Sequence, residues 1–230
     1  MKIALLGYGK MGRMVEEAAS RRQIEVVCVI DPLAGSRGRL EDADVCIDFS
    51  EPAAVIDNIK RVAAAGRAMV VGTTGWYDRI EEVRRIVDMG QVGFVYGSNF
   101  SIAVNLMFKI ARYSARLFSR FNSHEPFLTE AHHQFKKDAP SGTAIFLKRE
   151  VEAETKRDVP VASLRAGFIP GTHTVGFDSE ADTLAITHTA RSRAGFADGA
   201  IVAAEWIAPR RGFYEFSEII AEQLKERDES

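Results

Sequence analysis

The stretch Gly7-Tyr8-Gly9-Lys10-Met11-Gly12 decides the fold of the N-terminal half of this chain. An apolar run at residues 2–6 precedes it, and residues 10–20 follow with apolar side chains at helical spacing. A strand, a G-x-G-x-x-G turn and a helix in this order are typical of a βαβ unit that binds a dinucleotide. The three glycines permit the tight turn, the approach of a pyrophosphate and close packing of helix on strand. The first N–H groups of the helix then attract the phosphates.

Asp31 closes the next apolar run, residues 24–30, about 20 residues beyond the turn, where an acidic residue holds the ribose hydroxyls of NAD. A plainer interpretation is that the glycines only form a turn and Asp31 only begins a loop. We favour the cofactor site because the turn, its context and the acid agree. Arg37 and Arg39 are near enough in sequence to hold a 2′-phosphate, so NADH and NADPH both remain candidate cofactors.

Apolar runs at residues 45–49, 68–71 and 92–96 also end in turn residues. Such runs, separated by helices, predict a parallel sheet covered on both faces, whose ligands lie beyond the carboxyl ends of the strands. Ser50 is expected to cap the helix after the first of these runs. Ordinary turn chemistry explains the residues after the other two, but we expect them to contact the cofactor: Gly72, Thr73, Thr74, Ser98, Asn99, Phe100 and Ser101.

The second half of the chain follows a different pattern. A long helix, a strand and a helix are expected at residues 102–118, 127–132 and 142–154. Three successive strands follow at 162–169, 172–178 and 183–190, then helices at 194–207 and 215–224 and a frayed polar tail at 225–230. Grouped strands predict a separate antiparallel or mixed sheet. We therefore predict an α/β fold in which a dinucleotide-binding domain, residues 1–101 plus 194–230, carries an inserted α+β domain, residues 102–193.

The composition is that of an ordinary globular protein, with 46% hydrophobic and 27% charged residues in a chain of 230. The formal net charge of −2 gives no bulk attraction to nucleic acid or to an anionic membrane. Cys28 and Cys46 each lie in an apolar run, which indicates buried thiols rather than a disulfide or a metal pair. No run approaches the ~20 apolar residues of a membrane helix, and no signal peptide is evident, so a cytoplasmic protein is expected.

The stretch from Glu130 to Ala144, EAHHQFKKDAPSGTA, is the most informative part of the chain. Ser141, Gly142 and Thr143 open a helix whose free N–H groups and hydroxyls suit a carboxylate. Lys136 or Lys137 adds a charge-assisted hydrogen bond, and a histidine transfers protons near neutral pH.

Plainer interpretations of this stretch exist. Ser141 alone can be a helix cap, and the lysines a solvated turn. His132 and His133 can bind a metal, but neighbours on a strand face opposite ways and no third ligand stands out. We favour anion binding and proton transfer, with no metal, because a cap does not need histidines and a lysine beside it.

The same stretch resembles the signature of the 4-hydroxy-tetrahydrodipicolinate reductase family, also called dihydrodipicolinate reductase. The resemblance spans nearly the whole chain. It continues in Val45 to Ser50, Gly72 to Gly75, Ser98 to Ser101, Val104-Asn105, Arg165 to Gly167, Gly171 to His173, and Phe196 to Ala200.

The resemblance implies a Rossmann-like domain with an α+β domain whose open sheet builds a homotetramer. His132 would be the catalytic proton donor and acceptor, Lys136 the second proton donor, and His133, Gly142 and Thr143 substrate contacts. The implied reaction reduces 4-hydroxy-tetrahydrodipicolinate, a small dicarboxylate, with NADH or NADPH and loss of water, in lysine biosynthesis through diaminopimelate. The cofactor would contact Gly7 to Gly12, Asp31, Gly72 to Thr74 and Ser98 to Ser101.

This sequence departs from the family pattern in three places. Its glycine turn is one residue tighter than usual, Ala103 replaces a usual glycine, and the segment from Asp31 to Asp44 is short. None of these removes a catalytic position, but the short segment leaves the choice between NADH and NADPH open.

Two rival functions remain. One is another amino-acid-pathway dehydrogenase; a semialdehyde dehydrogenase needs a nucleophilic cysteine, and no cysteine follows residue 46. The other is a non-catalytic dinucleotide sensor, which has no use for His132 and Lys136. Turnover separates these classes, since fold alone does not.

Overall fold

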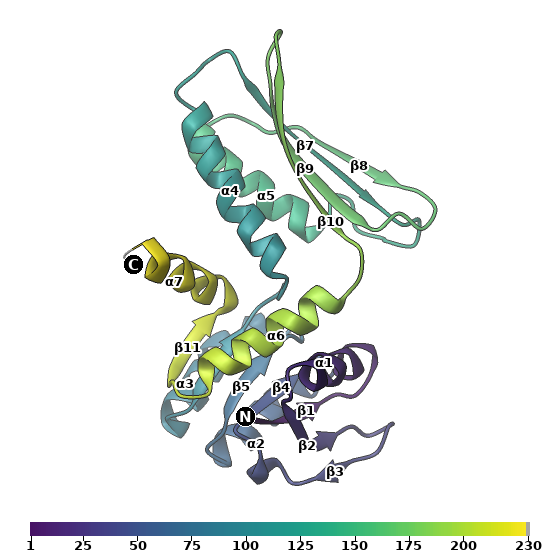
Figure 1. Cartoon of the computed structure of the whole chain (residues 1–230), viewed down its shortest axis with the longest axis vertical. Helices are drawn as coiled ribbons and strands as arrows, with labels where there is room; N and C mark the ends of the chain where they lie inside the picture. The colour runs from purple at the N-terminus through teal and green to yellow at the C-terminus, as the bar shows by residue number, and fades with distance from the viewer. Residues whose placement is uncertain (229–230) are drawn as a thin grey trace. The chain divides into compact units, whose positions relative to one another are not determined.

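The computed structural model describes residues 1–228, and they divide into two compact units. Unit 1 combines Met1–Ile102 with the chain from Arg193 onward, and unit 2 is Ala103–Ser192. The predicted domain limits, 101/102 and 193/194, lie one residue from these boundaries. Figure 1 labels the elements of both units.

Unit 1 is built on a seven-stranded sheet in the order β11-β6-β5-β4-β1-β2-β3. All its pairings are parallel except that of β3 with β2. The chain reverses its direction of sheet growth at β1, so a crevice opens beyond the carboxyl ends of β1 and β4. The strands are β1 (Lys2–Leu6), β2 (Glu25–Ile30), β3 (Arg37–Gly38), β4 (Val45–Asp48), β5 (Ala68–Val71), β6 (Gly93–Tyr96) and β11 (Gly212–Glu215).

Helices cover this sheet because its strands are apolar on both sides. α1 packs against α6, while α2 and α3 enclose a core that includes Leu6, Cys46 and Val71. Cys28 and Cys46 are both buried and free, as predicted. The helices are α1 (Lys10–Arg21), α2 (Val55–Ala64), α3 (Ile80–Gly90), α6 (Ala194–Ile207) and α7 (Phe216–Asp228), with short 3-10 turns at Leu40–Asp42 and Tyr77–Arg79.

Unit 2 contains a four-stranded mixed sheet in the order β10-β9-β7-β8. β7 pairs in parallel with β8 and antiparallel with β9. Two helices cover one face of this sheet, as Figure 1 shows, and close a core around Leu128, Leu147 and Val175. The elements are α4 (Ile102–Phe118), β7 (Glu125–His132), α5 (Gly142–Thr155), β8 (Val161–Arg165), β9 (Gly171–Asp178) and β10 (Thr183–Ala190).

Several local predictions were wrong. Ser50 does not cap α2; its hydroxyl donates to Asp48, and Ala54 precedes the helix without a side-chain cap. The predicted strand at 162–169 ends at Arg165, because the chain turns at Gly167 with a φ of 45°. β3 and β11 were missed. α7 runs on to Asp228 where a frayed tail was expected, and residues 229–230 of that tail lie outside the described residues.

No helix within residues 1–228 combines the length and the apolar character needed to cross a membrane.

Candidate active site

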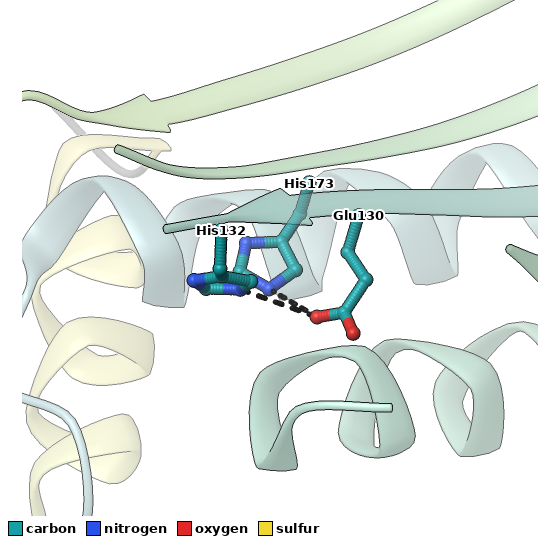
Figure 2. Close-up of side chains that lie close together, drawn as sticks. All are labelled: Glu130, His132 and His173. Carbon is teal, nitrogen blue, oxygen red and sulfur yellow. Dashed lines mark ion pairs between the residues drawn. The ribbon is translucent and has the colours of Figure 1, made fainter. Parts of the chain in front are cut away.

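A cluster of charged and imidazole side chains lies on the helix-covered face of the unit 2 sheet. Side chains alternate along a strand, so Glu130 and His132 share the face of the core residue Leu128. The strand register places Ser163 of β8 and His173 of β9 on either side of Glu130. Arg165 faces the same way two residues beyond Ser163. Figure 2 shows Glu130, His132 and His173 turned toward one another.

Glu130 is buried, and one of its carboxylate oxygens is fully hydrogen-bonded. Oε1 accepts from the Ser141 backbone N–H at 3.0 Å, the Ser163 hydroxyl at 2.7 Å and Nη2 of Arg165 at 2.7 Å. Burial raises the pKa of Glu130, but hydrogen bonds from Ser141, Arg165 and Ser163 outweigh it and lower the pKa to about 2. This carboxylate is therefore ionised near neutral pH.

The two imidazoles stand close to the other oxygen of Glu130. Nε2 of His132 lies 3.2 Å from Oε2, and Nε2 of His173 lies 3.5 Å from it. Burial lowers the pKa of His132, and Lys136 and Arg165 lower it further against the opposing charge of Glu130. Burial and the neighbouring His132 lower the pKa of His173 to about 4. Both rings therefore favour the neutral form in the free protein.

The N-terminus of α5 lies beside this cluster. Ser141 is the helix cap, since its hydroxyl oxygen accepts from the Ala144 N–H at 3.2 Å. The same oxygen lies 3.0 Å from Nε2 of His173, and Ser141 is buried. The plainer interpretation of Ser141 as a cap is thus confirmed for its hydroxyl. Gly142 is exposed with open space where a Cβ would stand, and Thr143 is half-buried, so an anion can reach this helix end.

The segment after β7 carries the other predicted substrate and proton-transfer residues. His133 is exposed, while the side chain of His132 is only 12% exposed, so the neighbours do face different ways. Nζ of Lys136 donates to both carboxylate oxygens of Asp138, at 2.8 and 3.0 Å. Lys137 is exposed.

The structure offers a third potential metal donor that the sequence did not indicate. One atom each of Glu130, His132 and His173 lies within 4.8 Å of the others. The guanidinium of Arg165 already neutralises this carboxylate, which opposes a second cation there. The absence of a metal in the working protein stays a prediction.

The glycine turn of unit 1 is closely packed at two of its glycines and open at the third. Gly7 has a φ of 84°, and a Cβ on Gly12 would lie 2.2 Å from the Gly7 carbonyl oxygen, so backbone packing requires both glycines. Gly9 differs, because nothing lies within 4 Å of the position its Cβ would take. Gly9 also precedes α1 without a side-chain cap, which leaves helix N–H groups for a phosphate. Lys10 is exposed and Met11 half-buried at the start of this helix.

Asp31 lies beside the glycine turn, as predicted, but its carboxylate is already engaged. It accepts from the backbone N–H groups of Tyr8 at 2.6 Å, Leu33 at 2.8 Å and Ala34 at 2.6 Å. These bonds, led by that of Ala34, lower the pKa of Asp31. Asp31 therefore fixes the loop, and its contact with a ribose stays a prediction.

An arginine pair borders the same loop. The guanidinium carbons of Arg13 and Arg37 lie 4.6 and 5.3 Å from the centroid of the Tyr8 ring, and Glu16 holds Arg37 at 2.6 Å. Arg39 is more exposed and lies 3.7 Å from Glu41.

Several residues after β5 and β6 that are predicted to contact the cofactor already make contacts within unit 1. The hydroxyl of Thr73 donates to the buried Asp48 at 2.7 Å, and a Cβ on Gly72 would strike the Phe49 ring. Thr74 and Ser98 are exposed. Oδ1 of Asn99 accepts from the Ser101 N–H at 2.9 Å, and Phe100 is buried in contact with Phe49 and Phe216.

Sequence reasoning gave no role to four residues that organise these sites. They are Asp48 in unit 1, whose pKa burial raises, and Glu130, Arg165 and His173 in unit 2. All four lie in stretches that carry the family resemblance. The sequence therefore marked these positions, but it did not indicate what each residue does.

Comparisons with known proteins agree with these two units. The sequence model of the N-terminus of dihydrodipicolinate reductase matches residues 1–100, and that of its C-terminus matches residues 103–220. A 4-hydroxy-tetrahydrodipicolinate reductase of Christiangramia forsetii is 35% identical over 238 residues, covering 98% of this chain and all of the relative.

Solved structures share the fold. A dipicolinate-bound dihydrodipicolinate reductase from Paenisporosarcina sp. TG-14 superposes with a TM-score of 0.81 at 20% identity, over 95% of this chain and 99% of that chain. Aspartate semialdehyde dehydrogenase II from Vibrio cholerae reaches a TM-score of 0.55 at 10% identity, over 90% and 98% of the two chains. The predicted α/β class with a Rossmann-like sheet is confirmed, and the two sequence models together span nearly the whole chain. This chain belongs to the dihydrodipicolinate reductase family.

Proposed function

We propose that this chain is a 4-hydroxy-tetrahydrodipicolinate reductase of lysine biosynthesis through diaminopimelate. It reduces (2S,4S)-4-hydroxy-2,3,4,5-tetrahydrodipicolinate to (S)-2,3,4,5-tetrahydrodipicolinate with loss of water, at the expense of NADH or NADPH. The observation that carries this proposal is the proton-transfer cluster around His132 beside the uncovered N-terminus of α5. The relative at 35% identity bears the same enzyme name.

The nicotinamide dinucleotide would bind unit 1 and supply a hydride. The open space at Gly9 and the uncapped start of α1 fit its pyrophosphate. Asp31 would accept from a ribose hydroxyl, with Arg37 beside it for a 2′-phosphate. The remaining contacts are proposed from Gly7 to Gly12, Gly72 to Thr74 and Ser98 to Ser101.

The dicarboxylate substrate would bind unit 2. Gly142 and Thr143 offer backbone N–H groups and a hydroxyl at the positive end of α5. His133 and Lys136 bring further donors from the segment after β7, and Ser141 holds the helix end in place through its cap. The solved relative that shares this fold has dipicolinate bound, which is also a dicarboxylate.

His132 and Lys136 would perform the proton transfers. Reduction of the conjugated substrate develops negative charge, which an acid must neutralise, and loss of the hydroxyl group also needs a proton. An imidazole can take up and release a proton during turnover. Burial lowers the pKa of His132, so the neutral ring is its resting form. Lys136 donates to Asp138 and acts electrostatically on His132.

We keep both NADH and NADPH as cofactors, a cytoplasmic location and a homotetramer. The tetramer is supported by the face of the unit 2 sheet opposite its helices, where Thr174 and Thr187 pair at 3.0 Å and Leu164 is 52% exposed. Light scattering of the purified protein measures this assembly directly.

The decisive experiment mixes purified protein with enzymatically generated 4-hydroxy-tetrahydrodipicolinate and follows NADH and NADPH oxidation by absorbance. Oxidation that depends on both enzyme and substrate is the expected result. Protein that binds NADH but oxidises none of it would instead support a dinucleotide sensor. Oxidation only with another amino-acid-pathway substrate would indicate a different dehydrogenase.

A further inference from the structure

The two oxygens of the Glu130 carboxylate have different surroundings. Oε1 accepts three hydrogen bonds, from Ser141, Ser163 and Arg165, at 2.7 to 3.0 Å. Oε2 is buried and has no hydrogen-bond partner among the described residues. A buried carboxylate oxygen without a donor is costly, so this atom requires one.

Two imidazole nitrogens lie within 3.5 Å of Oε2, and only one of them is free of another hydrogen-bond partner. Nε2 of His173 lies 3.0 Å from the Ser141 hydroxyl, closer than its 3.5 Å to Oε2. Whichever of these two groups donates, that nitrogen is occupied by Ser141. Nε2 of His132 lies 3.2 Å from Oε2 and is itself a buried atom without another hydrogen-bond partner in the described chain. Oε2 of Glu130 and Nε2 of His132 therefore point toward each other, as Figure 2 shows.

The Cε1–Nδ1 edge of the His132 ring lies against Gly171. A Cβ on Gly171 would lie 2.9 Å from Cε1 and 3.2 Å from Nδ1 of His132. The Cβ of any other residue at position 171 would therefore crowd this edge of the ring.

We propose that Glu130 is the positioning residue of this site: its Oε2 accepts the Nε2–H of His132, which leaves Nδ1 as the atom that exchanges a proton with substrate. This inference rests on the proposed function, which makes His132 the proton donor. Three hydrogen bonds hold the carboxylate in place, and one of them comes from Ser141, the N-cap residue of the proposed substrate-binding helix α5. Glu130 thus fixes the helix end and the imidazole relative to each other.

The charge of Glu130 also sets the protonation of His132. The charged or titratable groups that face this ring in unit 2 are Glu130, Lys136 with its partner Asp138, Arg165 and His173. Lys136 and Arg165 disfavour the imidazolium, and Glu130 opposes them. Removing the negative charge of Glu130 therefore lowers the pKa of His132 further and reduces the fraction of enzyme that carries the proton to be donated.

The test compares Glu130→Gln with Glu154→Gln, a matched loss of charge on α5 where Glu154 pairs with Arg112. The Gln side-chain oxygen still accepts from the three donors of Oε1. Its amide N–H₂ replaces Oε2 and points a donor, not an acceptor, at His132. We expect kcat to fall about 10²-fold, with KM for NADH unchanged and the pH–rate profile shifted to lower pH. The Glu154 variant should match wild type. A Glu130→Gln enzyme with wild-type kcat and pH profile overturns the proposal.

Imidazole ¹⁵N shifts of the wild-type protein give a second test that needs neither a variant nor turnover. Neutral His132 should carry its proton on Nε2, and a proton on Nδ1 would refute the assignment even if the Gln variant fails to fold. If wild type does not reduce the substrate, the proposed function fails. The tautomer, and the His132 pKa in the folded Gln variant, still decide the role of Glu130.

Discussion

Nζ of Lys136 donates to both carboxylate oxygens of Asp138, at 2.8 and 3.0 Å. A bound dicarboxylate offers the same kind of acceptor, so the lysine can exchange Asp138 for a substrate carboxylate without losing a charge-assisted bond. Lys137, the next residue, is exposed. These two adjacent lysines allow a matched comparison.

We expect Lys136→Ala and His132→Gln to lower kcat by about 10²- to 10⁴-fold, the range for loss of an acid–base group. Binding of NADH, followed by fluorescence titration, should persist because both residues belong to unit 2. Lys137→Ala is the control and should retain wild-type turnover. Full activity of either the His132 or the Lys136 variant contradicts the role given to that residue.

Arg37 should influence the choice of cofactor. Its guanidinium lies by the Tyr8 ring and the Asp31 loop, while Glu16 holds it in place. A 2′-phosphate gains a charge-assisted bond there that a 2′-hydroxyl does not. Arg37→Ala should therefore raise KM for NADPH about tenfold, the effect of about 1.4 kcal/mol, and leave KM for NADH nearly unchanged. An equal effect on both cofactors would place the 2′-phosphate elsewhere.

Most of the fold followed from apolar runs, and the failures have physical causes. β11 has only four residues, half-buried or exposed, which is too little for a recognisable pattern. β3 is two exposed residues paired at an edge. The segment after Arg165 misled because Phe168 and Ile169 suggested a strand, yet Phe168 is 85% exposed. An apolar residue does not by itself indicate burial.

The candidate site also contains residues that are neighbours in sequence and residues that only the fold brings together. His132, Lys136 and Ser141 lie within one short stretch, so their chemistry could be predicted together. Glu130 meets Arg165 from 35 positions away, and His173 from a third strand. That meeting depends on the register of three strands, and a one-residue slip would turn each side chain to the other face. A single sequence carries no direct sign of this register.

Activity should not depend on a metal ion, although Glu130, His132 and His173 could surround one. Arg165 shares the carboxylate at 2.7 Å, and its positive charge opposes a divalent cation. Treatment with excess EDTA followed by gel filtration should therefore leave kcat unchanged. A loss of turnover that added Zn²⁺ or another divalent ion restores would show that the cluster binds a functional metal.

The glycine turn separates cofactor binding from folding. A methyl group at position 9 meets open space in the protein, and Gly9 has an extended backbone with a negative φ of −76°. A methyl group at position 12 would lie 2.2 Å from the Gly7 carbonyl oxygen. Gly9→Ala should therefore keep the wild-type melting temperature and weaken NADH binding about tenfold or more. Gly12→Ala should cost about 1–3 kcal/mol of unfolding free energy.

Calorimetry and NADH titration of both glycine variants measure this contrast. Equal loss of melting temperature in both variants would mean that Gly9 is needed for packing. Unchanged NADH binding by a stable Gly9→Ala protein would remove the pyrophosphate from this turn.

His173 should make the protein less stable as the pH falls. Its pKa is about 4 in the folded protein, lowered mainly by burial, against about 6.5 when unfolded. The unfolded chain therefore binds a proton that the folded one excludes between these values. The stability is fully present above pH 6.5 and is lost as the pH falls toward 4.

Between pH 7.5 and 5 the His173 contribution amounts to about 2 kcal/mol of unfolding free energy. Glu130 adds only about 0.2 kcal/mol between these pH values, because its folded pKa of about 2 makes its contribution disappear mainly below its unfolded value of about 4.5. Urea unfolding of wild type and His173→Gln at the two pH values isolates the effect, since Gln carries no titrating group. The variant should lose less stability than wild type on acidification, by about that amount. Equal losses of unfolding free energy in the two proteins would mean that His173 is protonated as easily in the folded state as in the unfolded one. The buried position of this imidazole would then not lower its pKa.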